Sequence, residues 1–330
     1  MRGVAVFTMF TQHCMIIHER SGGEGGSLAA GLFVLLGTAP AAPVFLLLMG
    51  YLQADSRRSP PEELSGGLKL LLLGYLLNFL RLTLPLLLFS SPDRAAVAGG
   101  TPLELFLAVD ILQTAGLARM TLGLLRRLPG RLLLSSVLIP TVLLISPFLW
   151  SLPAGPVRDL FWGSGENVFF PYFPWIIYPL AGMILKELLN RRIFIKMRSR
   201  IAAGTGLMLS GLILMNFMPS GDYYRSCLPV HLFILGFLLL WHQAWELFAH
   251  VRGIPPARRL LQFWSLNVTA VYFVQWVLFG WSILLFGYRE QNAGTAALIG
   301  LAILILTTFS VALTRRIRRN ISNPAFPGLC

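Results

Sequence analysis

GLKLLLLGYLLNFLRLTLPLLLF, residues 67–89, is the stretch of sequence that decides the fold. A helix rises about 1.5 Å per residue, so about 20 apolar residues cross the hydrocarbon core of a bilayer. This stretch is long enough, with Lys69 near its start and Asn78 and Arg81 inside it. It therefore predicts a transmembrane helix.

The same composition extends along all 330 residues, of which 55% are hydrophobic and 12% charged. Soluble domains carry about a quarter of charged residues, so the deficit indicates an all-α, polytopic integral membrane helical bundle. No long linker or internal repeat interrupts the apolar segments, and we expect a single domain over residues 1–330. The ten expected spans are residues 1–18, 28–52, 67–89, 103–125, 132–152, 172–189, 201–219, 228–249, 265–287 and 295–314.

The positions of the 27 Lys and Arg residues give these spans an orientation. Cytoplasmic loops hold an excess of positive charge. With both termini in the cytoplasm, 21 basic residues lie on the inner side and five on the outer side, one in each outer loop, while Arg81 lies within a span. The net charge of +13 is therefore explained by topology rather than by nucleic-acid binding. A multi-pass protein of the plasma membrane, the inner membrane of a bacterium, is the simplest location.

The three cysteines, Cys14, Cys227 and Cys330, show no paired spacing. The sequence therefore indicates neither a disulfide framework nor a zinc site, and we expect no metal. The first eighteen residues contain a single arginine and no small-residue cleavage site follows them, so we expect them to stay as the first helix.

His13 is the first candidate catalytic residue. It lies eleven residues after Arg2, about 16 Å along a helix, and hence near the bilayer midplane. An ionisable side chain at that depth is costly and usually lines a cavity or meets a partner. Neutral imidazole is suited to general-base chemistry, although a histidine that only forms a packing hydrogen bond is equally compatible with the pattern.

Four further polar residues lie at similar depth in two neighbouring spans. Asn78 and Arg81 belong to the outward-running third span, and Asp110 and Gln113 to the inward-running fourth. Arg81 and Asp110 are expected to pair, because opposite charges in hydrocarbon neutralise one another. A purely structural ion pair and a catalytic one both fit this pattern.

Other polar positions carry less information. Asn267, Tyr272 and Gln275 form a polar stripe on the ninth span, and His231 and His242 are expected to be packing or interface residues. The outer loop at residues 153–171 ends in an aromatic segment, which fits either a membrane-interface belt or a loop that dips back into a cavity.

Several motifs then point to a family. The pattern Arg2-Gly3-x-Ala5-x-x-x-Met9-x-x-x-His13 resembles the first-helix signature of multi-span membrane acyltransferases. The resemblance is closest to the heparan-alpha-glucosaminide N-acetyltransferase-like proteins and weaker to the larger acyltransferase-3 group. Further segments agree in order with the family's later helices, although Gln275 stands where the family's segment commonly ends in histidine. These segments are APVFLLLMGY (42–51), LGYLLN (73–78), DILQTAGL (110–117), FPYFPWIIYPLAG (170–182) and SLNVTAVY (265–272).

The resemblance implies transfer of an acetyl or other acyl group from cytoplasmic acyl-CoA to a hydroxyl or amine of a sugar, glycan or lipid-linked acceptor. It makes His13 the central residue, as a base or as a covalent acyl carrier. Arg2, Asn78, Arg81, Asp110, Gln113, Asn267 and Tyr272 would then shape the polar interior.

The inner basic loops offer phosphate contacts for coenzyme A through Arg57, Arg58, Arg126 and Arg127. The lipid bilayer is the other partner, and the oligomeric state stays open between a monomer and a homodimer. The alternatives are a transporter or flippase, or a non-catalytic membrane protein of the same fold.

Overall fold

The computed structural model describes residues 1–20, 41–89, 100–153, 155–163, 165–193, 196–218, 222–248 and 255–322. These residues are largely helical, and the β-structure among them is limited to two isolated bridges. The predicted all-α class is therefore confirmed for the part of the chain described. The chain divides into two compact units: residues 1–38 with 253–330, and residues 39–252.

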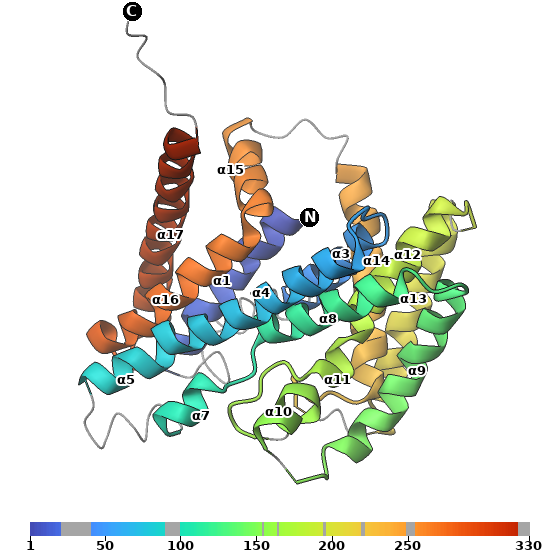
Figure 1. Ribbon diagram of the computed structural model, residues 1–330, viewed down its shortest axis with the longest axis horizontal. Coiled ribbons are helices and arrows are strands. Elements are labelled where there is room, and N and C mark those ends of the chain that lie inside the picture. Colours follow the sequence, from blue (N-terminus) through green and yellow to red (C-terminus); the bar gives the residue numbers. More distant parts are fainter. Residues whose placement is uncertain are drawn as a thin grey trace, which may run out of the picture. The chain divides into compact units, whose positions relative to one another are not determined.

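The first unit contains the N-terminal helix and the last three helices, which are drawn in blue and in orange to red in Figure 1. Helix α1 packs against all three of the others, and the indole Nε1–H of Trp264 on α15 donates to Thr308 Oγ1 on α17 at 3.0 Å. Residues from the two ends of the sequence therefore form one packed group. The helices are α1 (Arg2–His18), α15 (Pro255–Leu266), α16 (Val268–Phe286) and α17 (Ala293–Ser322).

The second unit is built from close helix pairs: α4 with α8, α3 with α12 and α13 with α14 (Figure 1). Small residues allow these approaches, as is common between membrane helices. A Cβ at Gly50 of α3 would collide with the Pro179 backbone of α12, and one at Gly182 of α12 with the Leu47 backbone. The helices are α3 (Ala42–Gln53), α4 (Pro60–Asn78), the π-helix η1 (Phe79–Thr83), α5 (Leu84–Phe89), α7 (Pro102–Phe106), α8 (Ile111–Leu125), α9 (Arg131–Leu149), α10 (Pro156–Trp162), α11 (Tyr172–Trp175), α12 (Ile177–Asn190), α13 (Met197–Leu214) and α14 (Leu228–Phe248).

Within the described ranges, five helices are long and apolar enough to cross a membrane. They support a membrane location, whereas the number of ten spans and the cytoplasmic termini stay predictions. The expected span at 28–52 lies partly outside the described residues. The five helices are Pro60–Phe89, Arg131–Leu149, Leu228–Phe248, Val268–Phe286 and Ala293–Arg319, and Ala42–Gln53 and Ile111–Leu125 are shorter apolar helices.

The expected fourth span, 103–125, is not one continuous helix, and that prediction is wrong. It is divided into α7 and α8, with a non-helical stretch at residues 107–110 between them. Asp110 begins α8 as its N-cap: its Oδ1 accepts from Ile111 N at 2.7 Å, and Gln113 Oε1 accepts from Asp110 N at 3.2 Å. This capping box gives the backbone groups partners where the helix starts.

Two other helix boundaries differ from the expected ones. The expected span 67–89 begins earlier, at Pro60, because Ser59 and Glu62 form a capping box ahead of the apolar run. The expected span 265–287 is divided by Asn267, where α15 ends and α16 begins. Asn267 Nδ2 donates to Phe263 O at 2.6 Å, so this side chain supports the junction.

Candidate active site

His13 lies on α1 and faces α16. The side-chain amide nitrogen of Gln275 is 2.9 Å from His13 Nδ1. The indole of Trp276 packs on the imidazole with ring centroids 4.3 Å apart, and the Phe279 ring stands edge-on at 6.2 Å. Gln275 is fully buried and His13 is half-buried. The histidine is therefore held between one amide and two aromatic rings.

The sequence motif before His13 explains how α1 comes so close to its neighbours. A Cβ at Gly3 would collide with the backbone of Leu261 on α15, so only glycine fits this contact without a backbone shift. Ala5 and Met9 are buried on the same helix. Most of the Arg-Gly-x-Ala pattern therefore serves packing, and Arg2 is half-buried at the start of α1.

The other end of α1 is tied to the turn between α16 and α17. His18 is fully buried, with Nε2 at 2.9 Å from Ser282 Oγ and Nδ1 at 3.3 Å from Gly287 O. Two backbone bonds follow, from Arg289 N to Ile17 O at 2.9 Å and from Gln291 N to His18 O at 2.8 Å. These contacts fix the register of α1 against α16, and hence the meeting of His13 with Gln275.

The polar stripe expected on the ninth span is only partly assembled. Tyr272 is buried one turn before Trp276, and their ring centroids are 6.3 Å apart. Tyr272 therefore extends the aromatic wall around His13. Asn267 instead supports the junction between α15 and α16, and Gln275 is the residue of the stripe whose polar group contacts His13.

In the second unit, the predicted pair of Arg81 and Asp110 is present. Arg81 Nη2 lies 2.6 Å from Asp110 Oδ2, and both side chains are 4% exposed. The same Nη2 donates to Asn78 Oδ1 at 3.0 Å. Asn78 Nδ2 in turn donates to Ala108 O at 2.6 Å, and Gln113 Nε2 to the same oxygen at 3.2 Å. The four residues thus form one buried network.

This network sits where two helices lose their regular geometry. Arg81 belongs to the π-helix η1, and π-helical turns often occur at functional sites. The break before α8 pairs with the loop that contains Asn167 and Phe169, through bonds from Val109 N to Asn167 O at 2.9 Å and from Phe169 N to Val109 O at 2.8 Å. The long loop therefore packs against the break that presents Asp110.

The four arginines expected to contact coenzyme A have different environments. Arg126 is buried: it donates to the carbonyl oxygens of Ser56 and Arg58, and Glu63 Oε1 lies 3.7 Å from its Nη1. Arg57, Arg58 and Arg127 are exposed. Arg126 thus holds the loop after α3, while the exposed arginines face solvent.

The sequence did not predict one buried hydrogen-bonded pair, a tyrosine and a histidine. Tyr178 on α12 and His231 on α14 are both buried, with Tyr178 Oη 2.8 Å from His231 Nδ1. His231 was expected to be a packing residue, and this hydrogen bond fits that interpretation. Tyr178 lies within the FPYFPWIIYPLAG segment, which was the available signal, although no spacing rule links it to a histidine 53 residues later.

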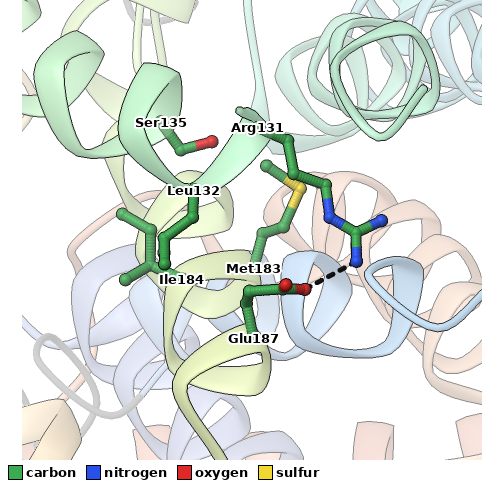
Figure 2. A pocket seen from close by; sticks show the side chains of 6 residues that line it. All are labelled: Arg131, Leu132, Ser135, Met183, Ile184 and Glu187. Atoms are coloured by element: carbon green, nitrogen blue, oxygen red, sulfur yellow. Dashed lines mark hydrogen bonds and ion pairs between the residues drawn. The ribbon is translucent and has the colours of Figure 1, made fainter. Parts of the chain in front are cut away.

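A small hollow lies between α9 and α12, lined by Arg131, Leu132, Ser135, Met183, Ile184 and Glu187 (Figure 2). The Arg131 and Glu187 side chains meet across it at 2.6 Å, and the hollow leaves no enclosed space for even a water molecule. Sites for drug-sized ligands measure about 300–1,000 Å³. The hollow is therefore too small for an acyl-CoA. In the described part of the chain, no cluster of His, Cys, Asp and Glu has the make-up of a metal site.

Comparison with known proteins assigns the chain to a family. The family model described as heparan-alpha-glucosaminide N-acetyltransferase, catalytic, matches residues 1–215, about two thirds of the chain. No curated protein and no solved structure matches. The matched region includes His13 and the network around Arg81, whereas Gln275 follows it. The chain belongs to the heparan-alpha-glucosaminide N-acetyltransferase catalytic-domain family, a family of acetyltransferases.

Proposed function

We propose that this protein is an integral membrane acyltransferase of the plasma membrane, with residues 1–330 as one acyltransferase domain. It would move an acetyl or other acyl group from cytoplasmic acyl-CoA to a hydroxyl or amine of a sugar, glycan or lipid-linked acceptor. Acyl-CoA would be its only co-substrate besides the acceptor.

The observation that carries this proposal is the family match over residues 1–215 together with His13 at a defined position on α1. A half-buried imidazole with one nitrogen engaged by a buried amide is a preorganised group. The resemblance suggests two roles for it: a base that takes the acceptor's proton, or a carrier that holds the acyl group. Both roles need a lone pair on a ring nitrogen.

The remaining residues receive supporting roles. Arg57, Arg58 and Arg127 are our candidates for the coenzyme A phosphates, because a guanidinium group binds phosphate through paired N–H donors. Arg126 would act indirectly, by holding the backbone that carries Arg58. Asn78, Arg81, Asp110 and Gln113 would maintain a rigid polar interior in the second unit.

The test is turnover by the purified protein in lipid nanodiscs with labelled acetyl-CoA and candidate acceptors. We expect acceptor-dependent release of free CoA by the wild type and its loss in folded His13→Ala. Phe7→Ala, an exposed position on the same helix, is the matched control and should stay active. Unchanged turnover in His13→Ala would refute the role of His13, and solute uptake without any need for CoA would favour a transporter.

A further inference from the structure

We propose that one end of the first unit, its basic end, binds the headgroups of anionic phospholipids, whose acyl chains lie along α17. The basic end consists of arginines from the start of α15 and from the end of α17. The acyl-transfer proposal does not use this surface, so the inference holds or fails independently of it. The arginines are Arg258, Arg259, Arg315, Arg316, Arg318 and Arg319.

The contact between Trp264 and Thr308 brings these two helix ends together. Trp264 Nε1 donates to Thr308 Oγ1 at 3.0 Å. Arg258 lies six residues before Trp264, and Arg315 lies seven residues after Thr308, which is about 9 Å and about 11 Å along the respective helices. The two helices run in opposite directions, and Figure 1 shows the start of α15 and the end of α17 at the same end of the unit. The arginines therefore gather at one level.

The acidic residues of this unit are Glu19, Glu24 and Glu290. Glu19 forms a backbone bridge with Gln291, so Glu19 and Glu290 lie at the turn before α17, about 33 Å along that helix from Arg315. Glu24 lies outside the described residues. In the described part of the unit, no acidic side chain therefore lies at the basic end. The exposed arginines of this end are Arg258, Arg259, Arg316, Arg318 and Arg319.

One face of α17 joins an apolar strip to the arginines. The side chains of the strip are 45% to 68% exposed and recur every three or four residues, which places them on one side of the helix. Arg316 follows on the same side, five turns after the first of them. This arrangement favours a phospholipid over a soluble phosphate compound, because a hydrocarbon chain covers the strip while the phosphate reaches Arg316. The strip consists of Leu298, Leu301, Ile305, Phe309 and Leu313.

The length of α17 brings the arginines to the depth of the headgroups. The apolar segment 295–314 is about 30 Å long, as thick as the hydrocarbon core of a bilayer. The helix continues to Ser322, so Arg316 and Arg319 project beyond the hydrocarbon on regular helical backbone. A guanidinium group binds phosphate through paired N–H donors, and each basic residue near an anionic membrane surface strengthens binding about fivefold.

The test is native mass spectrometry of the full, delipidated protein, titrated with phosphatidylglycerol or phosphatidylcholine that carries the same acyl chains. We expect the wild type to prefer phosphatidylglycerol. This preference should fall about tenfold or more in Arg316→Gln combined with Arg319→Gln, because two positive charges are lost. Arg316→Lys combined with Arg319→Lys keeps the charges and should keep most of the preference. An equal preference in the glutamine variant and the wild type would overturn the proposal.

The matched control is Lys196→Gln combined with Arg198→Gln, which removes two exposed charges at the start of α13 in the second unit. It should leave the preference unchanged. An equal loss in this control and in the Arg316 and Arg319 variant would show an effect of net charge alone and would overturn the site.

Free coenzyme A in excess supplies a competing source of phosphate. Phosphatidylglycerol should stay bound in its presence. Displacement of the lipid by coenzyme A from the wild type would assign the arginines to the acyl donor and overturn the lipid site. Bound lipid is counted by mass and no acyl transfer is needed, so failure of this proposal and failure of the proposed function are distinguishable.

Discussion

Replacing Asp110 tests whether the Arg81 network holds the second unit together. Asp110→Ala removes the carboxylate 2.6 Å from Arg81 Nη2 and leaves a guanidinium group that is 4% exposed in native packing. Breaking a buried ion pair from one side costs about 3–5 kcal/mol. The variant also loses the N-cap bond to Ile111 N, worth about 1 kcal/mol, so we expect a total loss of about 4–6 kcal/mol in the free energy of unfolding.

Two further variants separate these contributions. Asp110→Asn keeps an oxygen for the cap and should lose about 3–5 kcal/mol. Arg81→Met combined with Asp110→Asn removes both charges and should recover part of that loss, because no unpaired charge stays buried. The assay is reversible unfolding in mixed micelles, followed by tryptophan fluorescence.

The matched control is the more exposed pair of Asp222 and Arg225, whose side chains are 47% and 23% exposed and meet at 2.8 Å. Asp222→Asn should change the free energy of unfolding by no more than about 1 kcal/mol, because solvent screens an exposed pair. If Asp110→Asn also stays within about 1 kcal/mol of the wild type, the network is not a structural element and our reasoning about it is wrong.

Three further predictions concern packing and charge. Gly3→Ala should destabilise the protein by about 1–3 kcal/mol despite alanine's better helix propensity, because the new Cβ would collide with the Leu261 backbone. Thermal unfolding in detergent compares this variant with Gly206→Ala, where the new Cβ would meet no other atom within contact distance. Glu63→Gln should weaken the hold of Arg126 on the loop at residues 54–58, so the amide hydrogens of this loop should exchange faster than in the wild type. The control, Glu62→Gln, changes an exposed residue and should affect only the start of α4. Equal exchange rates in Glu63→Gln and the wild type would contradict this prediction. The hydrogen bond from Lys186 lowers the pKa of Asp55, so their 2.9 Å pair stabilises the fold above about pH 4 and loses this effect as the pH falls through the lowered pKa. The difference in the free energy of unfolding between the wild type and Asp55→Asn should be below about 1 kcal/mol at pH 7 and should vanish in acid. A difference that grew in acid would refute this prediction.

The two polar sites differ in how far sequence could predict them. The Arg81–Asp110 pair was predictable, since the sequence places opposite charges in two neighbouring apolar segments, where each charge needs a partner. The break before α8 was missed because residues 103–125 are apolar enough for one helix. Its local signal was Asp110 followed three residues later by Gln113, the spacing of a capping box.

The partner of His13 could not be predicted in the same way. Gln275 is 262 residues away in the sequence, and no periodicity of either helix says which faces meet. The contact depends on Gly3, His18 and the turn at Gly287, and these act together only in the folded unit. From the sequence, Gln275 could be recognised as part of a polar stripe and as the position where the family's segment commonly ends in histidine, but neither signal links it to His13.

Acyl transfer itself is the most direct test of the central claim. Purified wild type and His13→Ala are incubated in nanodiscs with isotope-labelled acetyl-CoA and a panel of amino sugars and lipid-linked glycans, and the products are analysed by mass spectrometry. We predict an acceptor that carries the labelled acetyl group with the wild type and not with His13→Ala, while both proteins give the same unfolding temperature to within a few degrees. Labelled product at the same rate with both proteins, or no labelled product with any acceptor of this class, would contradict it.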